Sequence, residues 1–388
     1  MSKLGTVALG IKAPIIKAED DIVKIVIDSL KDAIREDGIT IDDRDILCIT
    51  EAVVAKGQNN FVSLDDIAFD VKKKMGKGKV GLIYPIFSRN RFAPLLEGIV
   101  NGVDELILIL SYPKDEVGNS LIKNFHKYNI NPYLRNYTLK EFKNTFKETV
   151  HEFTDVDYLD LYKNVNKDKI SIVLSNDPLE VLKYTDKVIV ASVHNRAELK
   201  ETLIRNNAKK VIDLTEILNE PVNGSGYNEE YGLLGSNAST STLVKLFPRH
   251  DQSLITKIQD KVYKEFKKKI EVMVYGDGGF KDPIGGIWEL ADPVISPMYS
   301  KGLEGTPNEV KLKYLADNDF KGKLNIDDLV KERIKAKEKE LKGKSESLGT
   351  TPRRYVDLVG SLADLVTGSG DKGTPFVLIK NYFKNYSE

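Results

Sequence analysis

The chain of 388 residues is poor in the side chains that form disulfides and zinc sites. Its single cysteine, Cys48, excludes an intramolecular disulfide framework and any cysteine-rich metal site, and the apolar run around it predicts a buried strand. The histidines lie far apart in the sequence without the spacing of metal ligands, so a zinc site or a histidine-based hydrolase has little support. They are His126, His151, His194 and His250. The sequence also lacks a serine nucleophile elbow and a P-loop.

An excess of charge of one sign is missing as well. Lysine and arginine number 58, and aspartate and glutamate number 58, so no global field attracts nucleic acid or an anionic membrane. An anionic ligand must therefore be held by local geometry. Nowhere do eighteen uninterrupted apolar residues occur, and residues 1–10 lack the long apolar core of a signal sequence. We expect a cytoplasmic protein with neither nucleic acid nor a membrane as its partner.

What is present is a chain organised in three regions. Residues 1–75 contain two amphipathic runs with helical spacing, "DDIVKIVIDSLKDAI" and "LDDIAFDVKKKM", and a strand pattern in "RDILCITEAVVAK". Residues 77–218 alternate apolar strands with amphipathic runs, which favours a parallel α/β layer because parallel strands need crossover connections. An extension of one larger mixed sheet is the alternative there. From residue 219 on, the chain is richer in glycine and carries most of the short motifs.

Acidic residues in this third region are typical of a divalent-cation site. The strand pattern "IEVMVY" runs into Asp277, and a carboxylate at the end of a rigid strand is a common ligand for a cation bound to phosphates. Asp282 and Asp292 each precede a proline, which favours a turn. Asp357 and Asp364 lie seven residues apart on roughly one face of an apolar helix. A carboxylate there is costly unless it meets a cation or donors, which favours a role for Asp357.

The stretch "GSGDKGTP", residues 368–375, lies between that helix and an apolar strand. Glycines in a short connection serve a backbone that needs positive φ, or one that something must approach closely. An ordinary helix-to-strand turn is the alternative. Carboxylates, glycine-rich turns and a few lysines and arginines together suit metal-dependent phosphate chemistry, in which the protein mainly positions the reactants and neutralises charge.

Four segments of the sequence resemble the coenzyme F(420)-0:L-glutamate ligases. "APIIKAEDDIVKIVIDSL" with "DDRDILCITEAVVAKGQ" looks like the opening of that family, and "YGLLGSNASTSTLVKLFPRHDQSLITKIQDKV" is similar to its Ser-Asn loop and following helix. "EVMVYGDGGFK" resembles its strand ending in a metal-binding aspartate. "VDLVGSLADLVTGSGDKGTPFVLI" resembles its C-terminal helix, turn and strand. Each motif is weak alone, but the four occur in the family's order.

The resemblance implies an α+β fold. A mixed-sheet gamma-glutamyl ligase-like core would be formed by residues 1–76 and 219–388, with residues 77–218 as an inserted α/β region of parallel strands. It also implies an enzyme that uses GTP and Mg²⁺ or Mn²⁺, with K⁺ as a further candidate, to join L-glutamate through its amine to a carboxylate acceptor. The acceptor would take the γ-phosphoryl group as an acyl phosphate, from which the amine displaces phosphate. The same resemblance implies a homodimer.

The resemblance also assigns roles to individual positions. Those matched to metal ligands are Asp277 and Asp357. Those matched to nucleotide or phosphate contacts are Lys17, Lys56, Ser236, Asn237, Gly368, Gly370 and Gly373. Those expected to assist catalysis are Lys281, Arg353 and Arg354.

The sequence departs from the family pattern in three places. Phe280 and Lys281 stand where the family usually has Gly-Arg, and lysine keeps a point charge without the planar fork of arginine. Leu234 replaces an acidic residue expected in the Ser-Asn loop, and residues 77–218 have no recognised counterpart. These departures leave the acceptor open between coenzyme F(420)-0 and another carboxylate such as a folate. A nucleotide- or metabolite-binding protein without catalysis is the third hypothesis.

Overall fold

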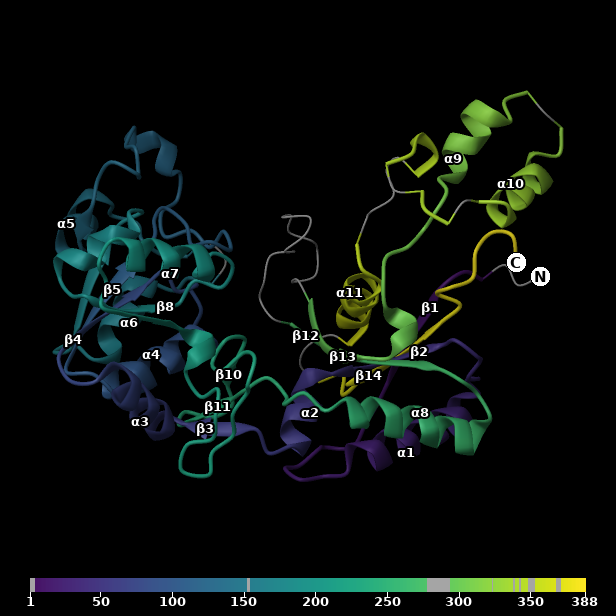
Figure 1. The fold of residues 1–388 in the computed structure, drawn as a ribbon, viewed down its shortest axis with the longest axis horizontal. Coiled ribbons are helices and arrows are strands. Elements are labelled where there is room, and N and C mark those ends of the chain that lie inside the picture. Colours follow the sequence, from purple (N-terminus) through teal and green to yellow (C-terminus); the bar gives the residue numbers. More distant parts are fainter. Residues whose placement is uncertain are drawn as a thin grey trace.

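The computed structural model describes residues 4–151, 154–277, 294–322, 324–337, 339–341, 343–347, 353–367 and 371–388. Within these ranges three β-sheets organise the chain (Figure 1). One sheet is mixed and another is largely parallel, and helices accompany both, which confirms the predicted α+β fold class. In this described part of the chain, no helix has the length and apolar character needed to cross a bilayer.

The first sheet joins the two ends of the chain. Its strands lie in the order β1-β14-β2-β12-β13, with β2 and β12 parallel and the other neighbouring pairs antiparallel. Their bounds are β1 (Val7–Ile11), β2 (Ile46–Thr50), β12 (Glu271–Asp277), β13 (Val294–Tyr299) and β14 (Phe376–Lys380). Because β1 pairs with β14, the two termini lie close together (Figure 1).

Helices cover both faces of this sheet. α1 (Ile22–Asp37) and α8 (Gln252–Phe266) pack on one face, and α11 (Tyr355–Thr367) packs on the other (Figure 1). Alternate side chains of β2 therefore enter two different cores, which explains why its apolar run is unbroken. Cys48 is buried in this strand as predicted, and burial raises the pKa of its thiol.

Local signals fix where the predicted helices begin and end. The side chain of Asp21 accepts a hydrogen bond from the Lys24 N–H at the start of α1, and Gly38 ends that helix in the left-handed conformation. α3 (Leu64–Met75) begins with a reciprocal pair of hydrogen bonds between Ser63 and Asp66. Both amphipathic runs of the N-terminal region are thus confirmed as helices.

The second sheet has the strand order β6-β7-β5-β4-β8-β9, and all of its strands are parallel except β6. Their bounds are β4 (Lys79–Ile83), β5 (Glu105–Leu110), β6 (Tyr137–Thr138), β7 (Ile170–Leu174), β8 (Lys187–Val190) and β9 (Lys210–Asp213). The accompanying helices are α4 (Phe92–Asn101), α5 (Leu139–Thr145), α6 (Tyr158–Val165) and α7 (Arg196–Arg205). This confirms the parallel α/β layer expected from the alternating sequence pattern.

The core of the parallel sheet extends beyond residues 77–218 on both sides. α3 packs against α4, where Gly98 lets Ile67 approach so closely that a Cβ would lie 2.8 Å from it. The same core cluster includes Val62 and Leu246. A small antiparallel sheet of β3 (Phe61–Ser63), β10 (Asn237–Ala238) and β11 (Leu243–Lys245) lies between the two larger sheets (Figure 1).

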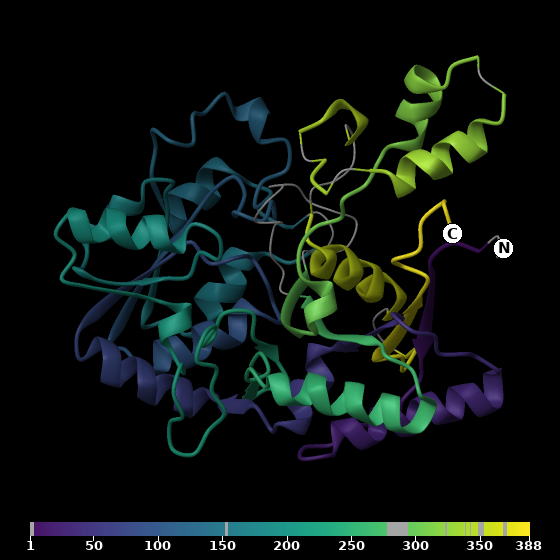
Figure 2. The same ribbon diagram turned by 45° about the vertical axis from the view of Figure 1, so that its right-hand side comes forward.

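A further, smaller cluster of apolar residues lies in the segment after β13. It packs α10 (Ile326–Lys335) against the turn that follows α9 (Leu312–Tyr314), through Leu315, Val330 and Ile334. Figure 2 shows this segment projecting away from both large sheets.

Candidate functional site

Several predicted site segments meet at one edge of the five-stranded sheet. β1 and β2 both end there, since Ile11 and Ile49 each pair with Phe376 at the start of β14. β12 runs parallel to β2 and ends at the same edge, with Tyr275 opposite Thr50. We call it the carboxyl edge, because the carboxyl ends of β1, β2 and β12 lie on it. Ligands of sheets with parallel strands commonly bind at such ends.

The glycine-rich turn before β14 lies on the carboxyl edge. Gly373 has a φ of 66°, in the left-handed region, and its carbonyl accepts a hydrogen bond of 3.0 Å from the Ala13 N–H. The carbonyl of Pro375 accepts one of 3.0 Å from the Thr50 N–H, at the start of α2 (Glu51–Gly57). The backbone at Gly373 thus has the conformation that favours glycine. Gly368 and Gly370 lie outside the described residues.

The two lysines matched to phosphate contacts lie near the same helix. Lys56 stands half-buried in the last turn of α2. Next to it, a Cβ on Gly57 would lie 2.6 Å from Ile22 and 3.2 Å from the carbonyl oxygen of Asp20, so the segment before α1 packs against this end of α2. Lys17 is exposed in that segment. The structure therefore brings the segments that carry both lysines together, and their contacts with phosphate stay a prediction.

The predicted metal ligand Asp277 is the last residue of β12. Its backbone pairs with Val294 of β13 on the carboxyl edge. Its side chain is outside the described part of the structure, as are Lys281, Asp282 and Asp292. Metal ligation by Asp277 and catalysis by Lys281 stay predictions.

A buried ion pair at the carboxyl edge escaped the sequence analysis. Glu51, the first residue of α2, has only 5% of its surface exposed, and its Oε1 lies 2.6 Å from the Lys245 Nζ. The Glu51 side chain also packs over the backbone of Gly276. A Cβ added at position 276 would lie only 2.1 Å from the Glu51 Cγ. The available signal was an acidic residue directly after a buried strand, but only the pairing of β2 with β12 places it beside Asp277.

Lys245 connects this edge to the Ser-Asn loop. It lies on β11 opposite Asn237 of β10, so both residues belong to one ladder. Ser236, just before, is buried, and its hydroxyl donates a hydrogen bond of 2.7 Å to the Leu233 carbonyl. Leu234 is buried in the core of the parallel sheet. The loop is therefore near the site through Lys245, but it offers no carboxylate from position 234.

The remaining predicted residues lie at the start of α11. Arg354 donates two hydrogen bonds to Asp357, from Nε to Oδ2 at 2.9 Å and from Nη2 to Oδ1 at 2.7 Å. Thr367, at the opposite end of the helix, contacts the hydroxyl of Tyr275. Tyr275 lies two residues before Asp277 in β12. Ten residues of α-helix separate Asp357 from Thr367, about 15 Å. The described residues thus do not bring Asp357 to the carboxyl edge, and its sharing of a metal with Asp277 stays a prediction.

Arg353, which precedes this pair, is buried with 5% of its surface exposed. Tyr355 at the start of the helix packs on Phe383, which follows the carboxyl end of β14, with ring centroids 5.5 Å apart. The start of α11 therefore lies towards the opposite edge of the sheet. Catalytic roles for Arg353 and Arg354 stay predictions.

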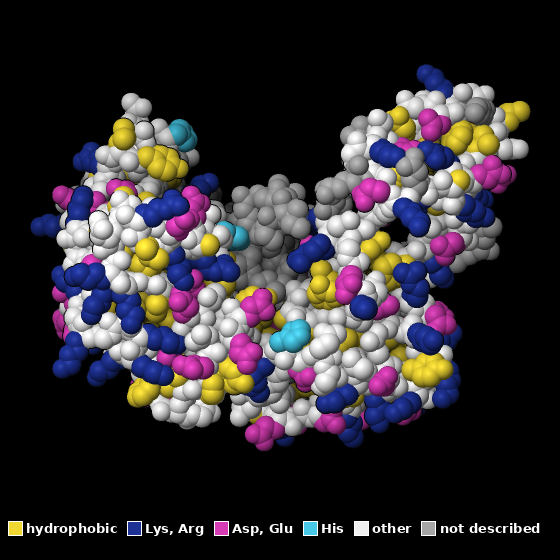
Figure 3. Space-filling model, in the orientation of Figure 1, with side chains coloured by type: hydrophobic (Ala, Val, Ile, Leu, Met, Phe, Trp, Pro, Cys, Tyr) yellow, Lys and Arg dark blue, Asp and Glu magenta, His cyan; other side chains and the backbone are white. Residues whose placement is uncertain are grey.

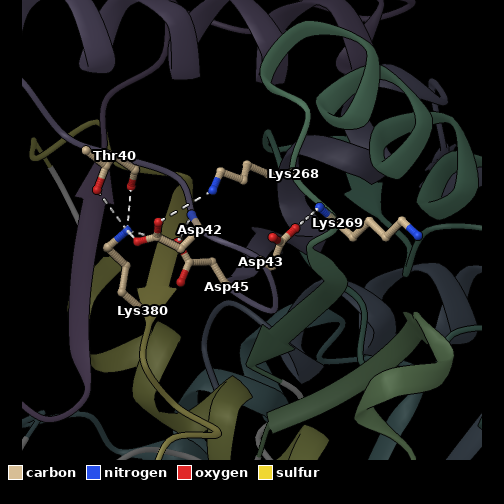
Figure 4. A network of polar contacts seen from close by, with 7 residues as sticks. All are labelled: Thr40, Asp42, Asp43, Asp45, Lys268, Lys269 and Lys380. Carbon is tan, nitrogen blue, oxygen red and sulfur yellow. Dashed lines mark hydrogen bonds and ion pairs between the residues drawn. The ribbon is translucent and has the colours of Figure 1, made fainter.

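A network of charged residues occupies that opposite edge (Figure 4). Lys380, the last residue of β14, donates hydrogen bonds to Asp42 Oδ2 at 2.7 Å, Asp45 Oδ2 at 3.0 Å and the Thr40 carbonyl at 2.6 Å. Lys268 Nζ lies 3.9 Å from Asp42 Oδ1. These contacts tie the end of β14 to the segments before β2 and β12, which is a structural role, and no predicted site residue takes part.

A cavity of about 560 Å³ opens beside the far end of α2. Its lining includes Gln58, Tyr227, Arg249, His250 and Pro297. Hydrogen bonds from Arg249 to Asn60 Oδ1 at 2.8 Å and to the Gln58 carbonyl at 2.9 Å hold its guanidinium in place. The volume falls in the range of small-molecule sites.

Cations and anions are mixed over the surface around these features. On the face drawn in Figure 3, lysine and arginine alternate with aspartate and glutamate without one continuous patch of either sign. Among the described residues, no three histidine, cysteine, aspartate or glutamate side chains gather closely enough to hold a metal ion.

The comparisons with known proteins bear on the same chain. A family model described as F420-0:Gamma-glutamyl ligase matches residues 10–381. This span confirms the resemblance read from the four motifs, and it runs through residues 77–218, for which the motifs gave no counterpart. Among curated proteins, none matches the chain.

Proposed function

The chain belongs to the F420-0:gamma-glutamyl ligase family, and from this premise we propose that it joins L-glutamate to a carboxylate acceptor with GTP as the energy source and a divalent metal as cofactor. That it is a ligase in the broad sense follows from the family itself. The nucleotide, the metal, the acyl phosphate and the acceptor belong to the proposal. Coenzyme F(420)-0 is the first acceptor to test, and a folate is the second.

One observation carries the proposal: segments far apart in the sequence meet at the carboxyl edge. The turn at Gly373 bonds to the segment after β1, Pro375 bonds to the start of α2, and β12 ends at Asp277 beside them. Triphosphates are held by backbone N–H groups, lysines and a cation. We assign the phosphates to this edge, with Lys17 and Lys56 as the neutralising cations.

The chemistry of such a site proceeds in two displacements. An oxygen of the acceptor carboxylate attacks the γ-phosphorus of GTP, the bond from phosphorus to the bridging oxygen breaks, and GDP leaves. The free amine of L-glutamate then attacks the carbonyl carbon of the acyl phosphate. The amide forms, inorganic phosphate leaves with the bonding electrons, and the nitrogen releases a proton to solvent. Neither step needs a cysteine or histidine nucleophile, so positioning and charge neutralisation are the protein's main tasks.

The donor set of the carboxyl edge fits a magnesium or manganese ion of the kind that one or two carboxylates and the phosphates of a nucleotide hold together. Asp277 is the first of those carboxylates by its position. When bound, the ion would supply neutralisation of the phosphate charge. The cavity lined by Gln58 and Arg249 is large enough to seat a small-molecule substrate, and we assign the acceptor to it.

The proposal extends to the setting of the enzyme. We expect a cytoplasmic homodimer that acts on small molecules and binds neither nucleic acid nor membranes. Light scattering coupled to size-exclusion chromatography tests the dimer, and a monomer at working concentration would contradict it.

The decisive experiment supplies GTP, Mn²⁺ and isotope-labelled L-glutamate to the purified protein in a deproteinised metabolite extract. Mass spectrometry should find a labelled conjugate one glutamyl residue heavier than its acceptor, and GDP and phosphate should appear in equal amounts. Omitting glutamate should abolish the conjugate, and ATP in place of GTP tests the base. A total lack of labelled conjugate would contradict catalysis and leave only binding of nucleotide or metabolite.

A further inference from the structure

We infer that Glu51 is a ligand of the divalent cation proposed at the carboxyl edge, in addition to Asp277, the ligand that the family resemblance implies. The inference rests on the proposed metal-dependent function and adds to it a residue that none of the sequence motifs indicated. It concerns one atom, the Oε2 of Glu51.

That atom is buried without a hydrogen-bond partner among the described residues. Glu51 as a whole has 5% of its surface exposed, and the only bond that its side chain makes there is the one from Lys245 to Oε1. A buried carboxylate oxygen without donors is unfavourable, and native proteins retain such an atom chiefly where an ion, a water or a reacting group satisfies it. The Oε2 of Glu51 is therefore available to bind a ligand.

The location of Glu51 indicates which ligand. It follows β2 directly and crosses the backbone of Gly276, so its carboxylate lies next to the end of β12, where Asp277 stands. Oxygen from carboxylates and phosphates is the preferred environment of Mg²⁺ and Mn²⁺.

The ion pair with Lys245 occupies one oxygen of the carboxylate and leaves the other available. The lysine already balances the charge of the carboxylate, and its ammonium lies on the ladder that carries Asn237. With Lys245 at one oxygen, only the second oxygen is open to an incoming ligand, and a divalent ion bridging to phosphate fits that arrangement.

A second buried carboxylate serves as a matched control. Asp70 on α3 is fully buried, its Oδ2 lies 2.7 Å from the Lys74 Nζ, and its Oδ1 also has no hydrogen-bond partner among the described residues. Asp70 differs in that its Oδ2 also accepts the backbone N–H of Leu218, so it joins two segments of the α/β core. It lies on a helix of the parallel sheet and not on the carboxyl edge.

The test measures Mn²⁺ binding by electron paramagnetic resonance of the free ion, with and without GDP. Either single change leaves the other member of the pair buried without its partner, so the informative comparison is between Lys245→Met and the double variant Glu51→Gln/Lys245→Met, which differ only in the carboxylate. Thermal melting checks that each variant is folded. We expect the double variant to weaken Mn²⁺ binding by about tenfold or more, a loss typical when groups that support a metal are removed. Lys245→Met and the control Asp70→Asn should each stay within about threefold of the unchanged protein on the same scale.

The other outcomes separate this inference from the proposed function. Should the folded double variant bind Mn²⁺ as tightly as the unchanged protein, Glu51 is not a ligand, while the metal-dependent reaction is untouched. Should the unchanged protein bind no Mn²⁺ in either condition, the proposed metal dependence is overturned together with the role of Glu51. An equal loss in Asp70→Asn would point to a general effect of buried charge and overturn the inference.

Discussion

Lys380 Nζ lies 3.0 Å from Asp45 Oδ2, although 335 residues separate the two side chains in the sequence. The Asp45 side chain is 3% exposed and that of Lys380 14%. This pair fastens the C-terminal strand β14 to the segment that enters β2 (Figure 4). This ion pair therefore holds the five-stranded sheet together at the edge opposite the carboxyl edge, which carries the candidate site.

Replacing Lys380 with methionine should destabilise the protein by roughly 3 kcal/mol, since the change leaves the buried carboxylate of Asp45 without its cation. Urea denaturation followed by circular dichroism measures the loss. Lys24→Met is the control, because it breaks an exposed Lys–Asp pair with Asp28 on α1 and should hardly move the midpoint. Equal midpoints for the two variants would show that the Lys380 network adds nothing.

Acid should weaken the fold through Glu116, whose carboxylate holds the loop after β8. Burial alone would raise the pKa of this carboxyl, but hydrogen bonds from His194, Val193 and Ser192 outweigh burial and lower it. A lowered pKa in the folded state contributes stability above the unfolded value of about 4.5, and this contribution is lost as the pH falls through the folded value. Denaturation from pH 7 to pH 3 should therefore show a smaller acid loss in Glu116→Gln than in the unchanged protein. Glu105→Gln, at an exposed pair with Lys79, should keep the full loss.

Gly276→Ala should damage the candidate site. The new Cβ would lie 2.1 Å from the Glu51 Cγ, so the glutamate or the strand must move. We expect a loss of about 2 kcal/mol from overpacking and at least tenfold lower ligase activity, on the order of what a misplaced site costs. Gly305→Ala controls for backbone effects, because its φ of 88° costs about 1 kcal/mol while its Cβ would have nothing within 4 Å. Full activity in Gly276→Ala would remove this edge from the site.

Asp357→Asn separates two roles of one carboxylate. Arg354 already donates two hydrogen bonds to this half-buried carboxylate, so we expect stability to fall by less than about 1 kcal/mol. Mn²⁺-dependent GTP binding should be lost, because the family resemblance implies that Asp357 is a metal ligand. Isothermal titration calorimetry with GTP and Mn²⁺ measures the binding. Persistence of this binding in the folded variant would contradict the predicted role of Asp357 as a metal ligand.

The sequence by itself determined the local structure and the family. The apolar run around Cys48 predicts the buried strand found at Ile46–Thr50, and the periodic run at Leu64–Met75 predicts the helix found there. Both signals are local, because side-chain direction repeats with the period of the element. The glycine at position 373 likewise indicates a backbone with positive φ, since few other residues adopt the left-handed conformation readily. Four motifs in order were enough to name the family, which the match over residues 10–381 confirms.

Only the tertiary structure decided which side chains meet. Glu51 and Lys245 are 194 residues apart, and neither reveals its partner in its own neighbourhood of the sequence. Their contact depends on how the small sheet that carries β11 packs against the five-stranded sheet that contains β2 and β12, and no local pattern in the sequence reveals that packing. Asp357 is a further case. Its apolar neighbours in the sequence indicated that it meets a cation or hydrogen-bond donors, but not that Arg354 is one of its partners. Secondary-structure propensity acts over a few residues, whereas long-range packing sets the partners of buried charges. The helices and strands could therefore be predicted from the sequence, but the ion pairs could not.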